Sequence, residues 1–286
     1  MTYFDLTKET VYPLFKARKT DTNKGDYGKA LLIAGSYGMA GAGMLAAKGC
    51  LCAGVGLCEI ACPDSIYPIL ATAVPEAVFF PYTDDLTPIR NQIRQADCVL
   101  IGCGCGDSPQ TDHLLCAALE NAKKTLIIDA DGINRLSRNI DLLKTEHAPV
   151  ILTPHPGEMA RLCGTSVQKV QENRLQTAKD FALLHGVTVV LKGHETVIAM
   201  PDGRCFVNHS GNAGMATGGS GDLLAGILAA FLCIMPLDDA VCAAVFVHGL
   251  AGDFSAQRYS MTSTTPTTIL KCLPFVFREI EQGKIV

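Results

Sequence analysis

The segment NHSGNAGMATGGSGDLLAGIL, residues 208–228, decides how this sequence is interpreted. Five glycines fall within the eleven residues from Gly211 to Gly221, Asp222 follows, and an apolar run begins directly after it. The first N–H groups of a helix have no partner within the helix, and glycines let an anion approach them closely. We therefore expect an anion-binding loop at the start of a helix, with a carboxylate at the junction.

Two interpretations of Asp222 compete. It is either a first-turn acid that stabilises the helix dipole, or a base that takes a proton from a hydroxyl beside the bound anion. A plain capping turn needs one or two glycines rather than five, which favours an anion-binding loop. A carboxylate beside bound phosphate is electrostatically costly unless it acts as a base or binds a hydroxyl, so the second interpretation of Asp222 is favoured. The loop is not a P-loop, because the pattern G-x-x-x-x-G-K-[ST] is absent from the sequence.

Composition limits the classes of partner. The 286 residues are 48% hydrophobic and 18% charged with a formal net charge of −4, so we expect a compact globular protein without nucleic acid or membrane partners. The N-terminus has no apolar signal-peptide core, and glycines interrupt the uncharged run at residues 30–47. These features predict a cytoplasmic protein.

The cysteine content predicts neither disulfides nor a metal centre. Thirteen cysteines are spread along the chain, an odd number without a secretory signal, which argues against a disulfide framework. The two C-x-C pairs, at residues 50–52 and 103–105, lack the C-x-x-C or histidine spacing of structural zinc sites. We expect most of these cysteines to be small buried hydrophobic residues.

Short β-branched runs alternate with helical patterns, which predicts an α/β fold with a mostly parallel central sheet and helices on both faces. The expected strands are residues 30–35, 56–62, 77–82, 98–102, 125–130, 150–154 and 188–193. The expected helices are residues 43–53, 112–121, 156–162, 166–185, 221–232, 238–257 and 267–282. A hairpin is expected near residues 196–209, a helical extension at 1–23 and one domain at 24–286.

Ligands in open α/β sheets bind beyond the carboxyl ends of the strands, and several further segments lie there. Lys192 ends one expected strand, and His155 is held between two prolines before Glu158 starts a helix. Glu158 is either a helix-start acid or a group that reaches a hydrated Mg²⁺. Glycine loops at residues 35–43 and 102–106 follow two other strands, and neither contains G-x-G-x-x-G in register. Asp129, Asp131 and Asn134 follow another strand.

Taken together, these segments resemble the ADP/ATP-dependent NAD(P)H-hydrate dehydratase family, whose members have a ribokinase-like α/β fold. The resemblance covers nearly the whole chain from Lys24. It is carried by KGDYG (24–28), GSYGMAGAGMLAAKG (35–49), VPEA (74–77), IGCG (101–104), IDADGIN (128–134), TPHPGE (153–158), VVLKGHETVI (189–198) and GNAGMATGGSGDLLAG (211–226).

The resemblance implies repair of NADH or NADPH that has added water across the C5–C6 bond (NADHX, NADPHX). ADP or ATP, with Mg²⁺, would phosphorylate the C6 hydroxyl, and phosphate would then leave. The resemblance also implies a homo-oligomer, as a tetramer, and no epimerase activity. The bacterial form of the GNAGMATGGSGD motif suggests ADP as the donor.

Site residues follow from the same resemblance, position by position. The residues implied to contact the hydrated dinucleotide are Ala42, Gly104, His155 and Asp222, with Asp222 also catalytic. The residues implied to contact the nucleotide are Lys192, Gly193, His194, Glu195, Thr196, Gly218, Gly219, Ser220 and Gly221. Glu158 is expected near Mg²⁺. Cys103 stands where relatives often have proline or another residue.

Two alternatives stay open at this point. A small-molecule kinase of the same fold, acting on a vitamin-like alcohol, would also use a glycine-rich anion site and an aspartate base. The glycine loops at residues 35–43 and 102–106 suit an extended dinucleotide better than one small ring. A nucleotide-sensing module without catalysis would not need Asp222.

Overall fold

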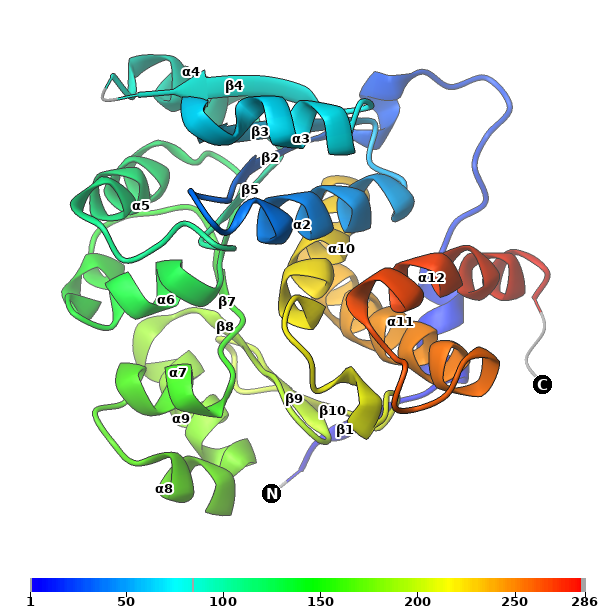
Figure 1. Cartoon of the computed structure of the whole chain (residues 1–286). Coiled ribbons are helices and arrows are strands. Elements are labelled where there is room, and N and C mark those ends of the chain that lie inside the picture. Colours follow the sequence, from blue (N-terminus) through cyan, green and yellow to red (C-terminus); the bar gives the residue numbers. More distant parts are fainter. Residues whose placement is uncertain (1, 84, 284–286) are drawn as a thin grey trace.

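The computed structural model describes residues 2–83 and 85–283, which form one ten-stranded sheet flanked by helices (Figure 1). The strand order is β1-β10-β9-β8-β7-β6-β5-β2-β3-β4. The strands are β1 (Phe4–Leu6), β2 (Lys29–Ile33), β3 (Leu57–Pro63), β4 (Val78–Tyr82), β5 (Cys98–Ile101), β6 (Thr125–Ile128), β7 (Val150–Leu152), β8 (Thr188–Leu191), β9 (Thr196–Ala199) and β10 (Cys205–Asn208).

The sheet is parallel except around β9, which runs antiparallel to both β8 and β10. This is the expected hairpin, closed where the Met200 N–H donates to the Arg204 carbonyl oxygen at 2.9 Å. The central strands read as continuous apolar runs because helices cover both of their faces. The expectation of a mostly parallel α/β sheet is confirmed.

Two hydrophobic layers lie on opposite faces of the sheet. The major helices on one face are α2 (Ala40–Cys52), α3 (Tyr67–Ala73), α10 (Ser220–Ile234), α11 (Leu237–Arg258) and α12 (Pro266–Glu281). The other face carries α4 (Thr87–Gln95), α5 (Pro109–Asn121), α6 (Ala130–Leu136), α7 (Pro156–Leu162), α8 (Val167–Glu172) and α9 (Arg174–His185). In Figure 1, α10, α11 and α12 lie to the right of the central strands and α5 to α9 to their left.

The N-terminal segment differs from the expected helical extension. After Met1, which lies outside the described residues, β1 pairs in parallel with β10 at the sheet edge. The rings of Phe4 and Phe206 lie 5.6 Å apart in this pairing. A single helical turn, α1 (Lys8–Val11), follows. Three residues of strand are too short to show a period in the sequence, and the open edge of β10 supplies their hydrogen bonds.

The helix expected at residues 166–185 is also divided. Asn173 has φ −138° and ψ 43°, outside the helical region, so α8 ends before it and α9 begins after it. The break lets Arg174 turn towards the end of β8, where its guanidinium donates to the Leu191 carbonyl oxygen at 3.0 Å.

Close packing of α10 against α2 fixes the start of α10. A methyl group on Gly226 would overlap the carbonyl oxygen of Ala46, and one on Gly49 would lie 2.7 Å from the carbonyl oxygen of Leu223. Only glycine permits this approach of one helix backbone to the other. The glycine loop before α10 is thereby held over the carboxyl ends of the strands.

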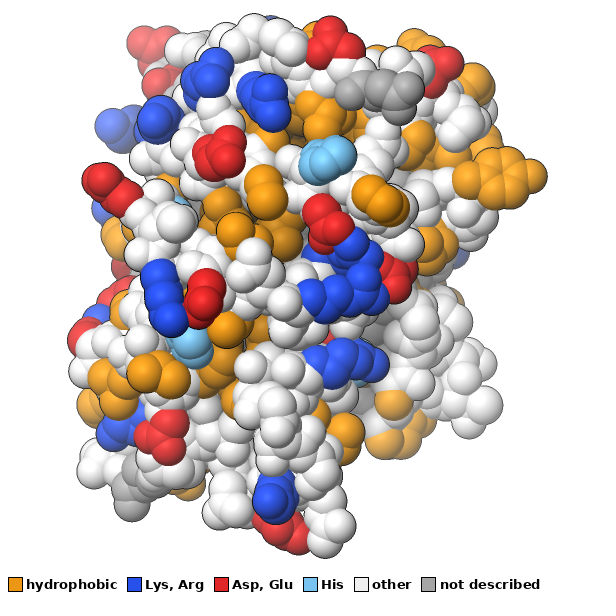
Figure 2. Space-filling model, turned by 90° about the vertical axis from the view of Figure 1, so that its left-hand side faces the viewer, with side chains coloured by type: hydrophobic (Ala, Val, Ile, Leu, Met, Phe, Trp, Pro, Cys, Tyr) orange, Lys and Arg blue, Asp and Glu red, His pale blue; other side chains and the backbone are white. Residues whose placement is uncertain are grey.

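Within residues 2–83 and 85–283, one helix, α11, is long and apolar enough to cross a membrane by length and composition. However, 78% of its most apolar window is buried inside the protein, which is the position of a core helix. On the face drawn in Figure 2, Lys and Arg side chains stand in small groups with Asp and Glu side chains beside them.

Candidate active site

The start of α10 is open to an anion. Gly219 is the N-cap residue at φ +92°, and no side chain caps the helix. The first N–H groups are therefore left without a side-chain partner. A methyl group on Gly218 would meet no atom within 4 Å, so there is space beside the loop. The Ser220 hydroxyl lies 3.4 Å from Nε2 of the buried His248.

An ion pair lies next to this loop. Nζ of Lys192, just after β8, is 2.7 Å from Oδ1 of Asp129, just after β6. The Thr153 hydroxyl donates to the same oxygen at 2.6 Å. Burial alone would raise the pKa of Asp129, but the Lys192 ammonium and these hydrogen bonds hold that pKa below its ordinary value. A methyl group on Gly221 would lie 3.2 Å from the Lys192 ammonium, so this charge faces the start of α10.

Asp222 lies in the first turn of α10 beside Asp129. Ligand atoms of Cys103, Asp129 and Asp222 all lie within 4.8 Å of one another. Burial, together with the nearby Asp129 carboxylate, raises the pKa of Asp222 to about 6. A carboxylate with this pKa is ionised at neutral pH and is a stronger base than an ordinary aspartate.

Glu158 joins His155 to this cluster. The His155 N–H donates to Glu158 Oε2 at 2.8 Å, while Nδ1 of His155 accepts from the Glu158 N–H at 3.3 Å, a capping box that starts α7. Oε2 of Glu158 also lies 4.0 Å from the Lys192 ammonium. Burial raises the pKa of Glu158, whereas burial and the Lys192 charge lower that of His155. About half of the His155 side chain is exposed, and Nε2 of its ring lies 3.3 Å from Oε1 of Glu158.

The glycine loop after β5 lies against the start of α2. Gly104 has φ +64°, and a methyl group there would lie 2.7 Å from Cβ of Ala42 and 3.0 Å from the Met39 carbonyl oxygen. The next glycine, Gly106, donates its N–H to Asp131 Oδ2 at 2.7 Å. Gly104 therefore contacts Ala42, while Cys103, directly before it, lies beside Asp129 and Asp222.

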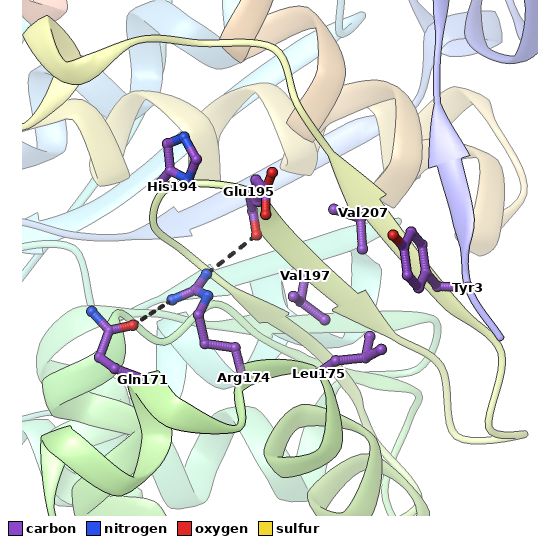
Figure 3. Close-up of a pocket in the computed structure, with 8 residues that line it drawn as sticks. All are labelled: Tyr3, Gln171, Arg174, Leu175, His194, Glu195, Val197 and Val207. Carbon is purple, nitrogen blue, oxygen red and sulfur yellow. Dashed lines mark hydrogen bonds between the residues drawn. The ribbon is translucent and has the colours of Figure 1, made fainter. Parts of the chain in front are cut away.

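The segment from Lys192 to Thr196 has two sides. Lys192 points to Asp129, whereas His194 and Glu195 line a separate cavity of about 350 Å³ (Figure 3). The Arg174 guanidinium stabilises this segment by donating to the carbonyl oxygens of Lys192 at 3.4 Å and Glu195 at 3.4 Å. Gly193 and Glu195 have positive φ angles of 144° and 54°. The cavity is lined by Tyr3, Gln171, Arg174, Leu175, His194, Glu195, Val197 and Val207.

Half of the site residues predicted from the sequence are connected, either by contacts with one another or through Cys103 and Asp129. These are Ala42, Gly104, His155, Glu158, Lys192, Gly221 and Asp222. Three residues lie elsewhere: His194 and Glu195 line the separate cavity, and Asn134 accepts a hydrogen bond from Arg161 at 2.9 Å.

Sequence reasoning gave no role to several groups of this cluster. The sequence places Asp129 at a strand end and Thr153 at the start of TPHPGE without predicting a role for either, and it does not single out His248. The sequence signal for Asp129 is its place after the apolar run TLII, at the same sheet edge as Lys192. The signal for His248 is a lone histidine in an apolar helix. Burial lowers its pKa to about 4, so it is neutral at pH 7.

Comparison with known proteins places this architecture in a class. A ribokinase-like superfamily protein from Enterococcus faecalis superimposes with a TM-score of 0.88 at 30% identity, over 97% of this chain and 96% of that one. The sheet, its crossover helices and the glycine loop before α10 are thus those of a ribokinase-like protein.

More specific matches follow. Residues 30–275 match the family model described as NAD(P)H-hydrate dehydratase. The ADP/ATP-dependent NAD(P)H-hydrate dehydratase of Bacillus subtilis, co-crystallised with ATP/Mg²⁺, superimposes with a TM-score of 0.89 at 32% identity, over 98% and 99% of the two chains. The ADP-dependent (S)-NAD(P)H-hydrate dehydratase of Neisseria meningitidis is 37% identical over 84% of this chain and 81% of its own. The chain belongs to the NAD(P)H-hydrate dehydratase family. It spans about half the length of the bifunctional NAD(P)H-hydrate repair enzymes that it also matches.

Proposed function

We propose that this protein dehydrates NADHX and NADPHX back to NADH and NADPH, using ADP or ATP, as a carbon–oxygen lyase of metabolite repair. The C6 hydroxyl of the hydrate receives a phosphoryl group, giving AMP from ADP or ADP from ATP. Phosphate then leaves C6 as the ring nitrogen donates its electron pair, and loss of a proton from C5 restores the double bond. The single observation that carries this proposal is Asp222, a carboxylate with a raised pKa in the first turn of the uncapped helix α10.

We assign roles to the chain's own residues on the same basis. Asp222 takes the proton of the C6 hydroxyl as it attacks phosphorus. The N–H groups at Gly219 and Gly221 stabilise charge on the transferring phosphoryl group, and the Ser220 N–H, which donates to the Thr217 carbonyl oxygen at 3.3 Å, would have to change partner to join them. The Lys192 ammonium, 2.7 Å from Asp129, adds positive charge at the same place. Ala42, Gly104 and His155 bind the hydrated dinucleotide.

The nucleotide position is part of the proposal. Gly193, His194, Glu195, Thr196 and Gly218 are proposed to contact the base and sugar of the nucleotide. The positive φ angles of Gly193 and Glu195 turn this segment sharply, and Arg174 holds it through three carbonyl oxygens. Backbone groups in such a turn are already positioned before the nucleotide binds, which lowers the entropy cost of binding.

Mg²⁺ is proposed as the companion of the nucleotide. When bound, it would neutralise charge on the phosphate oxygens. Mg²⁺ keeps several waters and uses one or two carboxylates, and the buried Glu158 is a nearby carboxylate that the proposed reaction does not use as its base. Since Glu158 Oε2 accepts the His155 N–H at 2.8 Å, we propose that Glu158 acts through water.

Three further properties are proposed from family resemblance: ADP as the preferred donor, a homotetramer and a cytoplasmic location. Relatives named as ADP-dependent support the first. Initial rates with each nucleotide test the donor, and light scattering tests the tetramer. Fractionation of cells that produce the protein tests the location. A rate that is higher with ATP, a stable monomer or a membrane-bound protein would each contradict the corresponding proposal.

The fate of the phosphoryl group tests the proposed activity. A dehydratase releases inorganic phosphate and forms reduced dinucleotide in equal amounts, whereas a kinase of the same fold leaves phosphate on its alcohol. We expect NADHX with ADP or ATP to give free phosphate. Turnover of hydroxymethylpyrimidine or a thiazole alcohol to a stable phosphoester, without turnover of NADHX, would contradict the proposal.

A further inference from the structure

Three side chains from three elements converge beside the start of α10: Cys103 after β5, Asp129 after β6 and Asp222 in α10. Their ligand atoms all lie within 4.8 Å of one another. Sγ of Cys103 is 3.5 Å from Oδ2 of Asp129. Among the residues that the structure describes, this is the one such group of three or more histidine, cysteine or acidic side chains. We call it the Cys103 cluster.

The two oxygens of Asp129 have different surroundings. Oδ1 is fully engaged, by the Lys192 ammonium at 2.7 Å and the Thr153 hydroxyl at 2.6 Å. Within the described part of the chain, the recorded partner of Oδ2 is the Cys103 thiol, which is a weak donor. Asp129 is only 1% exposed, so a buried carboxylate oxygen with a weak partner points at the cluster. Such an oxygen favours a stronger positive partner.

We propose that the Cys103 cluster binds a divalent cation with affinity for thiolate, of which Zn²⁺ is the typical example. Zn²⁺ lies about 2.3 Å from sulfur and about 2.1 Å from carboxylate oxygen in tetrahedral sites, which places the two ligand atoms about 3.6 Å apart. The observed 3.5 Å between Sγ and Oδ2 matches that spacing. The thiol proton is released to solvent as the S–Zn bond forms, and water completes the coordination.

The chemistry of the ligands selects the metal. Mg²⁺ takes hard oxygen ligands, whereas thiolate prefers Zn²⁺ and related metals. Two carboxylates and one thiolate compensate the cation, and Lys192 keeps its place on Oδ1 of Asp129. Since Asp222 would then be a metal ligand, Zn²⁺ inhibits any reaction in which Asp222 is the base. Only this inhibitory consequence rests on the proposed function; the metal site itself does not.

Binding of Co²⁺ to the full-length protein, without nucleotide or substrate, tests the site. We expect a thiolate-to-cobalt charge-transfer band in the near ultraviolet that saturates at one equivalent and is abolished by one equivalent of Zn²⁺. Cys103→Ser is expected to lose the band. Cys163→Ser, which removes the exposed thiol, is the matched control and is expected to retain it. Asp222→Asn is expected to weaken Co²⁺ binding at least about tenfold, since loss of even a second-shell group costs 10–100-fold.

The outcomes separate this inference from the proposed function. No band in the wild type, or a band that survives Cys103→Ser and disappears in Cys163→Ser, would overturn the site. If Cys103→Ser does not fold, the Asp222→Asn titration decides, and unchanged affinity there overturns the site. A normal cobalt band in a protein that does not turn over NADHX would support the metal site and contradict the proposed activity.

Discussion

The partly exposed Lys192 and the buried Asp129 form an ion pair, with Nζ 2.7 Å from Oδ1, and the same ammonium faces Gly221 at the start of α10. The lysine is therefore largely neutralised before any phosphate arrives. In the proposed reaction it would orient and polarise the phosphoryl group from a fixed position, while the backbone N–H groups of the glycine loop supply much of the remaining attraction.

Removing one partner of this pair is expected to destabilise the fold. Lys192→Met leaves the Asp129 carboxylate buried without its cation, at a cost of about 3–5 kcal/mol in the free energy of unfolding. The double variant Lys192→Met/Asp129→Leu is expected to recover most of this loss, because both charges are gone. Urea denaturation measures both values. Lys144→Met, at an exposed lysine, is the control and is expected to change stability by less than about 0.5 kcal/mol. Equal losses in the single and double variants would contradict this pairing.

The pH dependence of activity follows from Asp222. The carboxylate must be ionised to take a proton, and burial raises its pKa to about 6. We therefore expect kcat/KM to fall about tenfold for each pH unit below about pH 6. The measurement is kcat/KM for NADHX across the acid range, with a coupled test that the protein stays folded. An acid limb near the ordinary aspartate value of 3.8 would show that this group is not the base in its observed environment.

The same raised pKa predicts a stability effect. Between the ordinary value of 3.8 and about 6, the folded protein holds a proton on Asp222 that the unfolded chain has released. This contribution to stability is therefore present below pH 3.8 and is lost as the pH rises through about 6. Asp222→Asn is expected to raise the free energy of unfolding at pH 7 by about 2 kcal/mol, with the difference vanishing at the acid end. A destabilised variant at pH 7 would contradict this.

Helix packing gives a prediction that is independent of the chemistry. Gly226→Ala is expected to destabilise the protein by about 1–3 kcal/mol, because its methyl group would overlap the Ala46 carbonyl and separate α10 from α2. Gly41→Ala, also in a helix but with no atom within 4 Å, is expected to be neutral or to stabilise by about 0.5 kcal/mol. Thermal unfolding compares the two. Equal effects would show that the backbone approach is not tight.

Much of the fold was predictable because most of its strands are short apolar runs that alternate with helical patterns. The hairpin at residues 196–209 and the start of α10 were also predictable from local residues. β1 was not, since its three residues depend on the edge of β10, far away in sequence. The break at Asn173 was missed for a related reason, because it serves a tertiary contact of Arg174.

In the site, too, local features were predictable and contacts between distant residues were not. Glycine loops and the residues beside them were found because their spacing is local. The partnership of Lys192 with Asp129 joins residues 63 positions apart, and no local pattern reports it. The contact of Cys103 with Asp129 spans 26 positions, so the sequence showed a C-x-C pair without its carboxylate neighbours.

The most direct test of the central claim is the return of reduced-nicotinamide absorbance from NADHX in the presence of Mg²⁺ and either ADP or ATP, with wild type and Asp222→Asn compared. If Asp222 is the base of the proposed reaction, recovery requires a nucleotide and falls by at least about 10²-fold in the folded Asp222→Asn variant. No recovery by folded wild type with either nucleotide, or full activity in Asp222→Asn, would contradict the claim.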